Sequence, residues 1–146
     1  MNDTQPFDYT RVPHAFAHCF NEHCPRAAEC LRRLAAQHIP AELPNVTAVN
    51  PHSIQSESDC PHFLPLQKIR IAWGIKGLFD HLPHKEAVAM RRELIAHFNK
   101  THYYRLQRKE YHLKPEEQEY IRQVFKKHGI ETEPVFEYYT EDYRWH

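Results

Sequence analysis

The sequence predicts a mainly α protein: a single small helical domain with an extended N-terminal segment and at most a short β element, organised around a four-cysteine site. Three observations lead to this prediction. The chain has 146 residues, the length of one ordinary domain. Apolar residues recur at helical spacing in several segments, and all four cysteines precede residue 61. We expect one domain over 1–146, with a Cys-rich part over 1–65 and a helical part over 66–146 that ends in an aromatic tail.

Composition predicts a folded protein outside the membrane. Hydrophobic residues make up 41% and aromatic residues 12% of the chain, which argues against disorder, and the formal net charge is zero. Apolar runs are only a few residues long, so no segment is expected to span a bilayer. No basic region followed by an apolar stretch marks a secretory signal. We therefore expect a cytoplasmic, reducing location, where cysteines serve as thiols or metal ligands more often than as disulfides.

The N-terminal half is expected to hold little regular structure. Residues 1–18 are predicted to be extended, with core anchors at Phe7, Tyr9, Val12 and Phe16. Residues 25–38 predict a helix, because Pro25 suits a first helical turn and an apolar stripe follows it. Residues 46–49 are a candidate short strand.

Helices are predicted to dominate the second half. Residues 66–82 predict a broad, largely buried helix, in which Gly74 and Gly77 lower the helicity and allow a neighbouring element to pack closely. Residues 84–98 carry an apolar stripe with the period of a helix. We therefore expect two consecutive helices here, separated by a proline.

The C-terminal third is predicted to contain two further helices and the tail. Thr101 is a suitable N-cap for a short helix over 102–108. The helix over 115–128 opens with proline and two glutamates, which suit the positive end of the helix dipole, and Gly129 supplies its stop. We expect the tail to fold back onto the body because it holds Phe136, Tyr138, Tyr139, Tyr143 and Trp145.

The spacing of the cysteines predicts a metal site. Cys19, Cys24 and Cys30 form a C-x4-C-x5-C segment, and Cys60 follows alone. Cys24 and Cys60 are each followed by proline, which fixes the backbone beside the sulfur and suits a turn around a metal. Four thiolates satisfy either one tetrahedral zinc ion or one iron–sulfur cluster. The competing interpretation is four reduced cysteines, some of them buried as small hydrophobic residues.

The pattern does not decide between the two metals, although we place zinc ahead of iron–sulfur. A C-x2-C pair, usual in zinc knuckles, is absent, and the Cys-Pro steps of bacterial ferredoxins occur here without the rest of their spacing. His18 and His23 neighbour the cysteines and could replace one ligand. A site with four thiolates has no open coordination position, so we expect a structural or redox role and not a hydrolytic one.

Charge is zoned along the chain although it cancels overall. Residues 91–109 carry six Lys or Arg and one acidic residue, whereas residues 131–146 carry five acidic residues and one arginine. The succession of helices around the basic zone resembles bacterial helix-turn-helix regulators, and that resemblance implies DNA contacts. The residues that could reach phosphates or base edges are His102, Arg105, Gln107, Arg108 and Lys109.

Other interpretations of the basic zone remain open. It departs from the helix-turn-helix pattern because the break at Asn99-Lys100 is tight and no glycine marks the turn. A structural helical corner with a solvated basic face, or a β-hairpin over 103–113, would explain the same residues. The acidic tail could also pack near the zone and neutralise it.

No catalytic motif is recognisable in the sequence. The chain has 13 histidines, but none stands in a metallohydrolase pattern, and no nucleophile elbow, phosphate-binding glycine loop or dinucleotide fingerprint occurs. We therefore expect most histidines to be surface or capping residues, and a protein that is more plausibly non-enzymatic than an enzyme.

Several segments carry a family resemblance that covers nearly the whole chain. They are FDYTRVPHAFAHCFNEHCPRAAECLRRLA, NP followed by CPHF, YYRLQRKE before PEEQEYIRQVF, and the ending EYYTEDYRWH. The chain resembles a family of short proteins of unknown function from anaerobic gut bacteria. That resemblance implies one domain and a recurring four-cysteine pattern, and nothing about a substrate.

Together these features predict an uncharacterised, non-enzymatic binding or regulatory protein that is stabilised by Zn²⁺ on its four cysteines. We expect its partner to be DNA or another protein, and not a membrane. The alternative is a small iron–sulfur redox protein.

Overall fold

The computed structural model describes residues 6–56 and 58–146, which form two compact units. Unit 1 comprises residues 1–67 together with 143–146, and unit 2 comprises residues 68–142. The last four residues thus belong to the same unit as the N-terminal half, which the sequence did not indicate.

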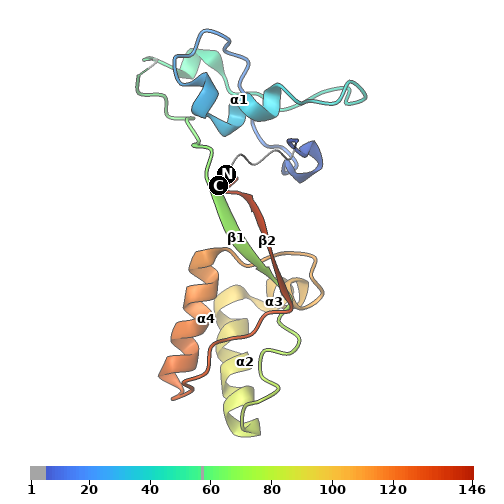
Figure 1. The fold of residues 1–146 in the computed structure, drawn as a ribbon, viewed down its shortest axis with the longest axis vertical. Coiled ribbons are helices and arrows are strands. Elements are labelled where there is room, and N and C mark those ends of the chain that lie inside the picture. The colour runs from blue at the N-terminus through green and yellow to red at the C-terminus, as the bar shows by residue number, and fades with distance from the viewer. Residues whose placement is uncertain (1–5, 57) are drawn as a thin grey trace. The chain divides into compact units, whose positions relative to one another are not determined.

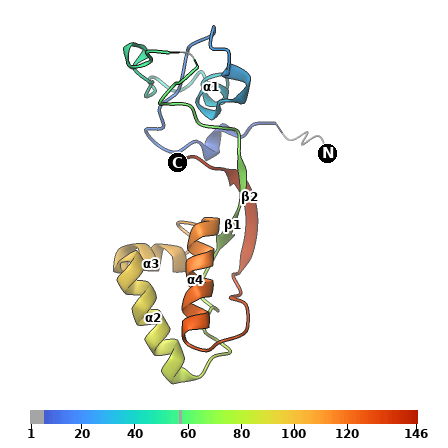
Figure 2. The same ribbon diagram turned by 90° about the vertical axis from the view of Figure 1, so that its left-hand side faces the viewer.

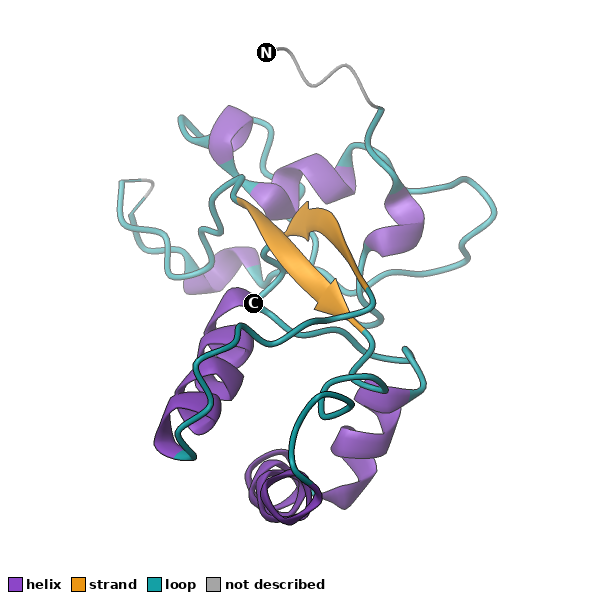
Figure 3. Ribbon diagram, turned by 60° about the horizontal axis from the view of Figure 1, so that its bottom comes forward, coloured by secondary structure: helices purple, strands orange, loops and turns teal. Residues whose placement is uncertain are grey.

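Unit 1 consists mainly of loops and short helices (Figure 3). Its described residues contain one α-helix, α1, Leu31–Ala36, and 3-10 helices at Tyr9–Arg11, Ala27–Glu29 and Pro51–Ser53. The predicted helix over 25–38 is therefore split. Cys30 has an extended backbone, with φ −107° and ψ 124°, and pairs with Pro65 as an isolated antiparallel bridge. The candidate strand over 46–49 is reduced to one bridge, between His18 and Ala48.

The hydrophobic core of unit 1 is small. Its buried members are Phe16, Leu31, Ala35 and Trp145. Partly buried residues around them include Phe7, Val12 and Tyr143. Phe7 and Phe16 were predicted as anchors from the sequence, and the aromatic end of the tail completes this cluster.

Unit 2 combines a two-stranded antiparallel sheet with three helices (Figure 1). Strand β1, Lys68–Trp73, pairs with β2, Tyr138–Tyr143. The helices are α2, His84–Phe98, α3, Lys100–Gln107, and α4, Pro115–Lys127. Helix α4 packs against β1 and against α2. The core lies among these elements, and its fully buried side chains include Ile71, Met90, Leu94, Leu106, Leu113 and Ile121.

The turn between α2 and α3 is built on a single asparagine. Asn99 ends α2 with a backbone φ of 66° and ψ of 160°, which lies outside the left-handed helical region and is a strained conformation for a residue other than glycine. Its side chain accepts a hydrogen bond from the His102 N–H at 2.9 Å and so caps α3. The chain therefore turns sharply between the two helices (Figure 2). Asn99 is the N-cap, and the cap predicted at Thr101 is wrong because that residue already lies inside α3.

Helix α4 has the start and stop that its sequence predicts. It begins at Pro115 and carries two glutamates in its first turn. Gly129 follows its C-terminus with a φ of 74°, and the N–H groups of Gly129 and Ile130 donate to the carbonyls of Lys126 and Phe125. This is the Schellman pattern, which satisfies carbonyls that the helix leaves without partners.

The predicted fold class is wrong in two respects. The protein is not plainly mainly α, because residues expected in a helix over 66–82 form strand β1 and the turns that follow it. The fold is also not organised around a four-cysteine site: no metal-binding group is seen among the described residues, and each unit has its own hydrophobic core. Within the described part of the chain, no helix is long and apolar enough to cross a membrane.

The aromatic tail packs onto the body at both of its ends. Phe136 is buried in the core of unit 2, and Trp145 is buried in the core of unit 1. Between them, Tyr138 and Tyr139 in β2 are largely exposed. The tail therefore contributes one buried anchor to each unit, and Tyr138 and Tyr139 lie on the surface.

Candidate functional site

All four cysteines line one small cavity in unit 1. The cysteines are not disulfide-bonded, and the cavity that they help to line has a volume of about 20 Å³, which is room for about one water-sized sphere. Cys30 is buried at the start of α1, and the other three cysteines are half-buried. The chain thus brings Cys60 to the same place as the three cysteines that precede it by 30 residues or more.

The two Cys-Pro steps form matching turns at this cavity. The Ala27 N–H donates to the Cys24 carbonyl at 3.1 Å, and the Phe63 N–H donates to the Cys60 carbonyl at 3.2 Å. In each turn the proline occupies the second position, where its fixed φ is favoured. The turns also contact each other, because the Arg26 guanidinium lies 3.4 Å from the centre of the Phe63 ring. Each turn therefore presents one cysteine at the cavity.

Helix α1 ties the remaining segments together. Arg32 donates from Nε to the His62 carbonyl at 2.8 Å and from Nη1 to the Ala17 carbonyl at 3.0 Å. The Cys19 N–H donates to the Arg32 carbonyl at 3.2 Å. One residue of α1 thus fixes the segment before Cys19 and the turn after Cys60. Because guanidinium donors are rigid and always charged, these links hold both segments against the helix.

The thiols do not yet form a ligand set. In residues 6–56 and 58–146, no three His, Cys, Asp or Glu side chains are arranged so that they could hold a metal ion. Each sulfur is placed by rotation about one side-chain bond, and cysteine occupies three staggered rotamers. The four cysteines therefore share a cavity without forming a metal-binding group in this structure.

The histidines near the cysteines differ in what they can do. The Nδ1 atom of buried His18 lies 2.9 Å from the Thr47 carbonyl oxygen, and its Nε2 atom lies 2.8 Å from the Tyr9 hydroxyl. A carbonyl only accepts, so Nδ1 carries the proton and Nε2 accepts the tyrosine hydrogen. Both ring nitrogens of His18 are occupied, which argues against its predicted role as a replacement ligand. His23 is exposed and does not line the cavity.

His62 was missed by sequence reasoning. It lines the cavity with the cysteines, and its Nε2 atom lies 2.7 Å from the Ser53 hydroxyl. The signal in the sequence was its position two residues after Cys60, inside the Cys-Pro turn. Arginines at positions 26, 32 and 33 line the same cavity.

Comparison with known proteins places the chain in a family. Residues 1–145 match a family described as a family of unknown function, DUF6078. The chain belongs to this family. No curated protein and no solved structure matches it. The family description mentions neither anaerobic gut bacteria nor a four-cysteine pattern. The origin and the cysteine pattern predicted from the resemblance therefore stay predictions for this DUF6078 protein.

The predicted nucleic-acid residues of this DUF6078 protein lie at the end of α3 and are engaged with acidic neighbours. Arg108 forms two hydrogen bonds with the Glu110 carboxylate, at 2.9 and 3.1 Å. Arg105 lies 3.9 Å from the same carboxylate, and Lys109 lies 3.4 Å from Glu137. All three cations are exposed, and a local acidic residue partly neutralises each of them. The alternative of a β-hairpin over 103–113 is wrong, because α3 extends to Gln107 within that segment.

The other two residues predicted to contact nucleic acid are half-buried. The His102 ring packs between Phe98 and Tyr111, at centroid distances of 5.8 and 4.8 Å, and Gln107 is the last residue of α3. DNA contact through these five residues stays a prediction, and their surroundings do not favour it.

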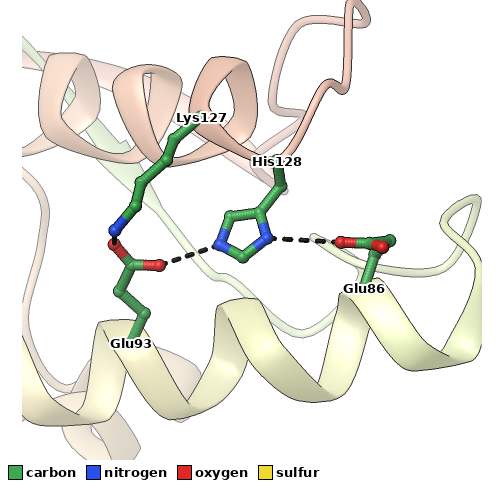
Figure 4. A network of polar contacts seen from close by, with 4 residues as sticks. All are labelled: Glu86, Glu93, Lys127 and His128. Atoms are coloured by element: carbon green, nitrogen blue, oxygen red, sulfur yellow. Dashed lines mark hydrogen bonds and ion pairs between the residues drawn. The ribbon is translucent and has the colours of Figure 1, made fainter.

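A second polar cluster joins α2 to α4 (Figure 4). His128, just after α4, lies between two carboxylates of α2: its Nδ1 is 3.2 Å from Glu86 and its Nε2 is 2.8 Å from Glu93. Both partners are acceptors, so both ring nitrogens donate, which only the imidazolium form can do. The hydrogen bond to Glu93, followed by that to Glu86, raises the pKa of His128. Lys127 and His128 together lower the pKa of Glu93. This cluster is a structural tie, because the carboxylates already hold both nitrogens.

Proposed function

We propose that unit 1 binds one Zn²⁺ ion through the cysteines at its cavity, and that this metal stabilises a non-enzymatic binding or regulatory protein. The observation that carries the proposal is that Cys19, Cys24, Cys30 and Cys60 all line one cavity. They come from separate segments, and α1 and two matching turns hold these segments together. A structural zinc site needs such a set of four ligands.

The size of the cavity supports a single ion over an iron–sulfur cluster. A space of about 20 Å³ takes one water-sized sphere. A cluster contains several iron and sulfide atoms and would require the two Cys-Pro turns to separate. Their contact through Arg26 and Phe63 opposes that movement.

The weak core of unit 1 supports a stabilising role for the metal. Its hydrophobic cluster has four buried residues, whereas that of unit 2 has fourteen. Small units that cannot bury enough apolar surface are usually held by disulfides or a metal. All four cysteines of the chain lie in unit 1, where such a link is needed.

The charges around the cavity support a thiolate site. A zinc ion with four thiolates carries two net negative charges. The arginines at 26, 32 and 33 line the cavity and would offset that charge. Four neutral thiols carry no charge, so they would not require three arginines around them.

Metal analysis of anaerobically purified protein, with its absorption spectrum, tests the proposal. We expect a colourless protein with one zinc per chain, and release of zinc by Cys24→Ser and Cys60→Ser. Ser58→Ala is the matched control, because Ser58 is exposed in the same loop and its hydroxyl group lies 2.9 Å from that of Ser56. A brown protein containing iron and sulfide would establish the alternative. Four reactive thiols without metal would overturn both.

A further inference from the structure

We infer that His62 is a ligand of the same metal centre, which would then be formed by three thiolates and one imidazole. This inference rests on the proposed zinc site and changes its ligand set. It is carried by a chain of hydrogen bonds that fixes which nitrogen of His62 bears the proton.

The chain of hydrogen bonds begins at Asn50. The Ser53 hydroxyl donates its one hydrogen to the Asn50 carbonyl at 2.6 Å. Toward His62 the same oxygen can therefore only accept, and it lies 2.7 Å from Nε2. The proton of a neutral His62 must then be on Nε2, which leaves a lone pair on Nδ1. A neutral imidazole with one free lone pair is the form that binds zinc.

The serine itself is held in place. The Ser53 N–H donates to the Asn50 carbonyl at 3.0 Å, and the Asn50 side chain accepts from the His52 N–H at 3.0 Å. These bonds shape the 3-10 helix that presents the hydroxyl group. Histidines that bind metals almost always donate their other N–H to such an oriented acceptor, which fixes the ring and its tautomer.

The backbone of His62 is also held at the cavity. Its carbonyl accepts from Arg32 Nε at 2.8 Å, which ties it to α1. It also lies inside the turn that Cys60 begins, so both residues move as one rigid piece. His18, by contrast, has both nitrogens committed elsewhere and is a structural residue.

The ligand set decides both the charge of the centre and the number of free thiols. Replacing one thiolate by a neutral imidazole changes the net charge of a zinc centre from minus two to minus one. Tetrahedral zinc takes four ligands, so five candidates imply that one of the four thiols stays free. The number of free thiols in the zinc-loaded protein is therefore a direct readout of the ligand set.

Two measurements on the full-length protein test the inference. The first is zinc affinity by competition with a chelating dye, for wild type, His62→Ala, Ser53→Ala and the control Ser58→Ala. We expect His62→Ala to lose affinity strongly. Ser53→Ala should lose about 10-fold to 100-fold, the usual effect of removing the partner of a ligating histidine. Ser58→Ala should bind as wild type does. Ser53 is exposed at the end of a 3-10 helix, so we expect Ser53→Ala to fold. The zinc affinity of Ser53→Ala therefore tests the inference even where His62→Ala fails to fold.

The second measurement counts thiols that react with an alkylating reagent in the zinc-loaded protein, with and without denaturant. We expect one thiol to remain free of zinc, and the signal of His62 Nδ1 in nitrogen-15 spectra to shift when zinc binds. A wild type that binds no zinc would overturn the proposed function itself. A wild type that binds zinc, with unchanged affinity in both His62→Ala and Ser53→Ala, would overturn only the role of His62.

Discussion

The Nδ1 atom of His18 donates to a backbone carbonyl, while His62 uses its Nε2 atom to donate to a serine hydroxyl. In the sequence, both histidines stand within two residues of a cysteine, and nothing there distinguishes them. Their hydrogen-bond partners come from residues 29 and 9 positions away. The role of each ring therefore depends on tertiary contacts, which is why sequence reasoning considered His18 and overlooked His62.

Glycines at two positive-φ positions give a prediction about backbone strain. Gly129 has a φ of 74°, and a Cβ atom added there would meet no atom within 4 Å. Gly129→Ala should therefore cost only the backbone strain, about 1 to 2 kcal/mol of unfolding free energy. Gly74 has a φ of 85°, and an added Cβ would also meet the Glu137 carboxylate. Gly74→Ala should cost more. Urea unfolding of both variants checks the order, and equal losses would contradict it.

The His128 cluster predicts a pH-dependent contribution to stability. Because the pKa of His128 is raised on folding, its contribution is fully present below the unfolded pKa of about 6.5. It is lost as the pH rises through the folded value. His128→Asn should therefore lower the unfolding free energy by about 1 kcal/mol at pH 6 and by less at pH 9. Urea unfolding at both pH values measures this.

Exposed His81 supplies the control for that experiment, since His81→Asn should have little effect at either pH. At low pH, protonation of Glu93 limits the stability that the His128 cluster contributes. Its pKa is lowered in the folded protein, so its contribution is present above the unfolded value of about 4.3 and is lost as the pH falls through the folded one. A loss in His128→Asn that is the same at pH 6 and pH 9 would show that the imidazole acts by packing alone.

At the level of elements, strong local signals were sufficient to predict helices α2 and α4. The helix predicted over 84–98 is α2 with the same bounds, and α4 ends one residue before its predicted end at 128. Proline at the start of α4 and glycine after it act within one turn, so the sequence alone contains the information. The prediction over 66–82 failed because an apolar count over a long window concealed the alternation Lys-Ile-Arg-Ile in 68–71. That alternation has the period of a strand.

Strand β2 connects two buried aromatics that belong to different units. Phe136 is 6% exposed in the core of unit 2, and Trp145 is 7% exposed in that of unit 1. Truncation of either to alanine should cost about 3 to 5 kcal/mol of unfolding free energy. In hydrogen-exchange measurements, Phe136→Ala should reduce the protection of amides in unit 2, and Trp145→Ala should reduce the protection of amides in unit 1. Tyr138→Ala, at an exposed site in β2, is the control. Loss of protection in the same amides for both variants would contradict the assignment.

For the molecule as a whole, convergence of the cysteines was beyond the reach of local patterns. Each Cys-Pro step predicts its own turn, and both turns form. The meeting of Cys60 with the other three depends on Arg32 and on the pairing of Cys30 with Pro65. These contacts join residues 30 or more positions apart in sequence, where neither periodicity nor composition carries information. The division into two units follows from the same long-range contacts.

The difference between the two cores predicts how the whole protein responds to loss of metal. Unit 2 has fourteen buried residues in its cluster and needs no further link, whereas unit 1 has four. Binding of zinc to the folded site alone stabilises that fold by mass action. Adding a strong chelator to the zinc-loaded protein should therefore abolish amide protection in residues 6–56 and 58–67 and leave that of residues 84–127 unchanged.

Hydrogen exchange followed by mass spectrometry measures both sets of amides in one sample. A second sample, with the chelator already saturated with zinc, controls for binding of the chelator itself. Protection in α1 should return when zinc is restored under reducing conditions, because a cysteine binds zinc only in its reduced form. Unit 1 amides that stay protected without metal would show that Phe16, Leu31, Ala35 and Trp145 hold the unit by themselves. In that case, zinc would have no part in the stability of unit 1.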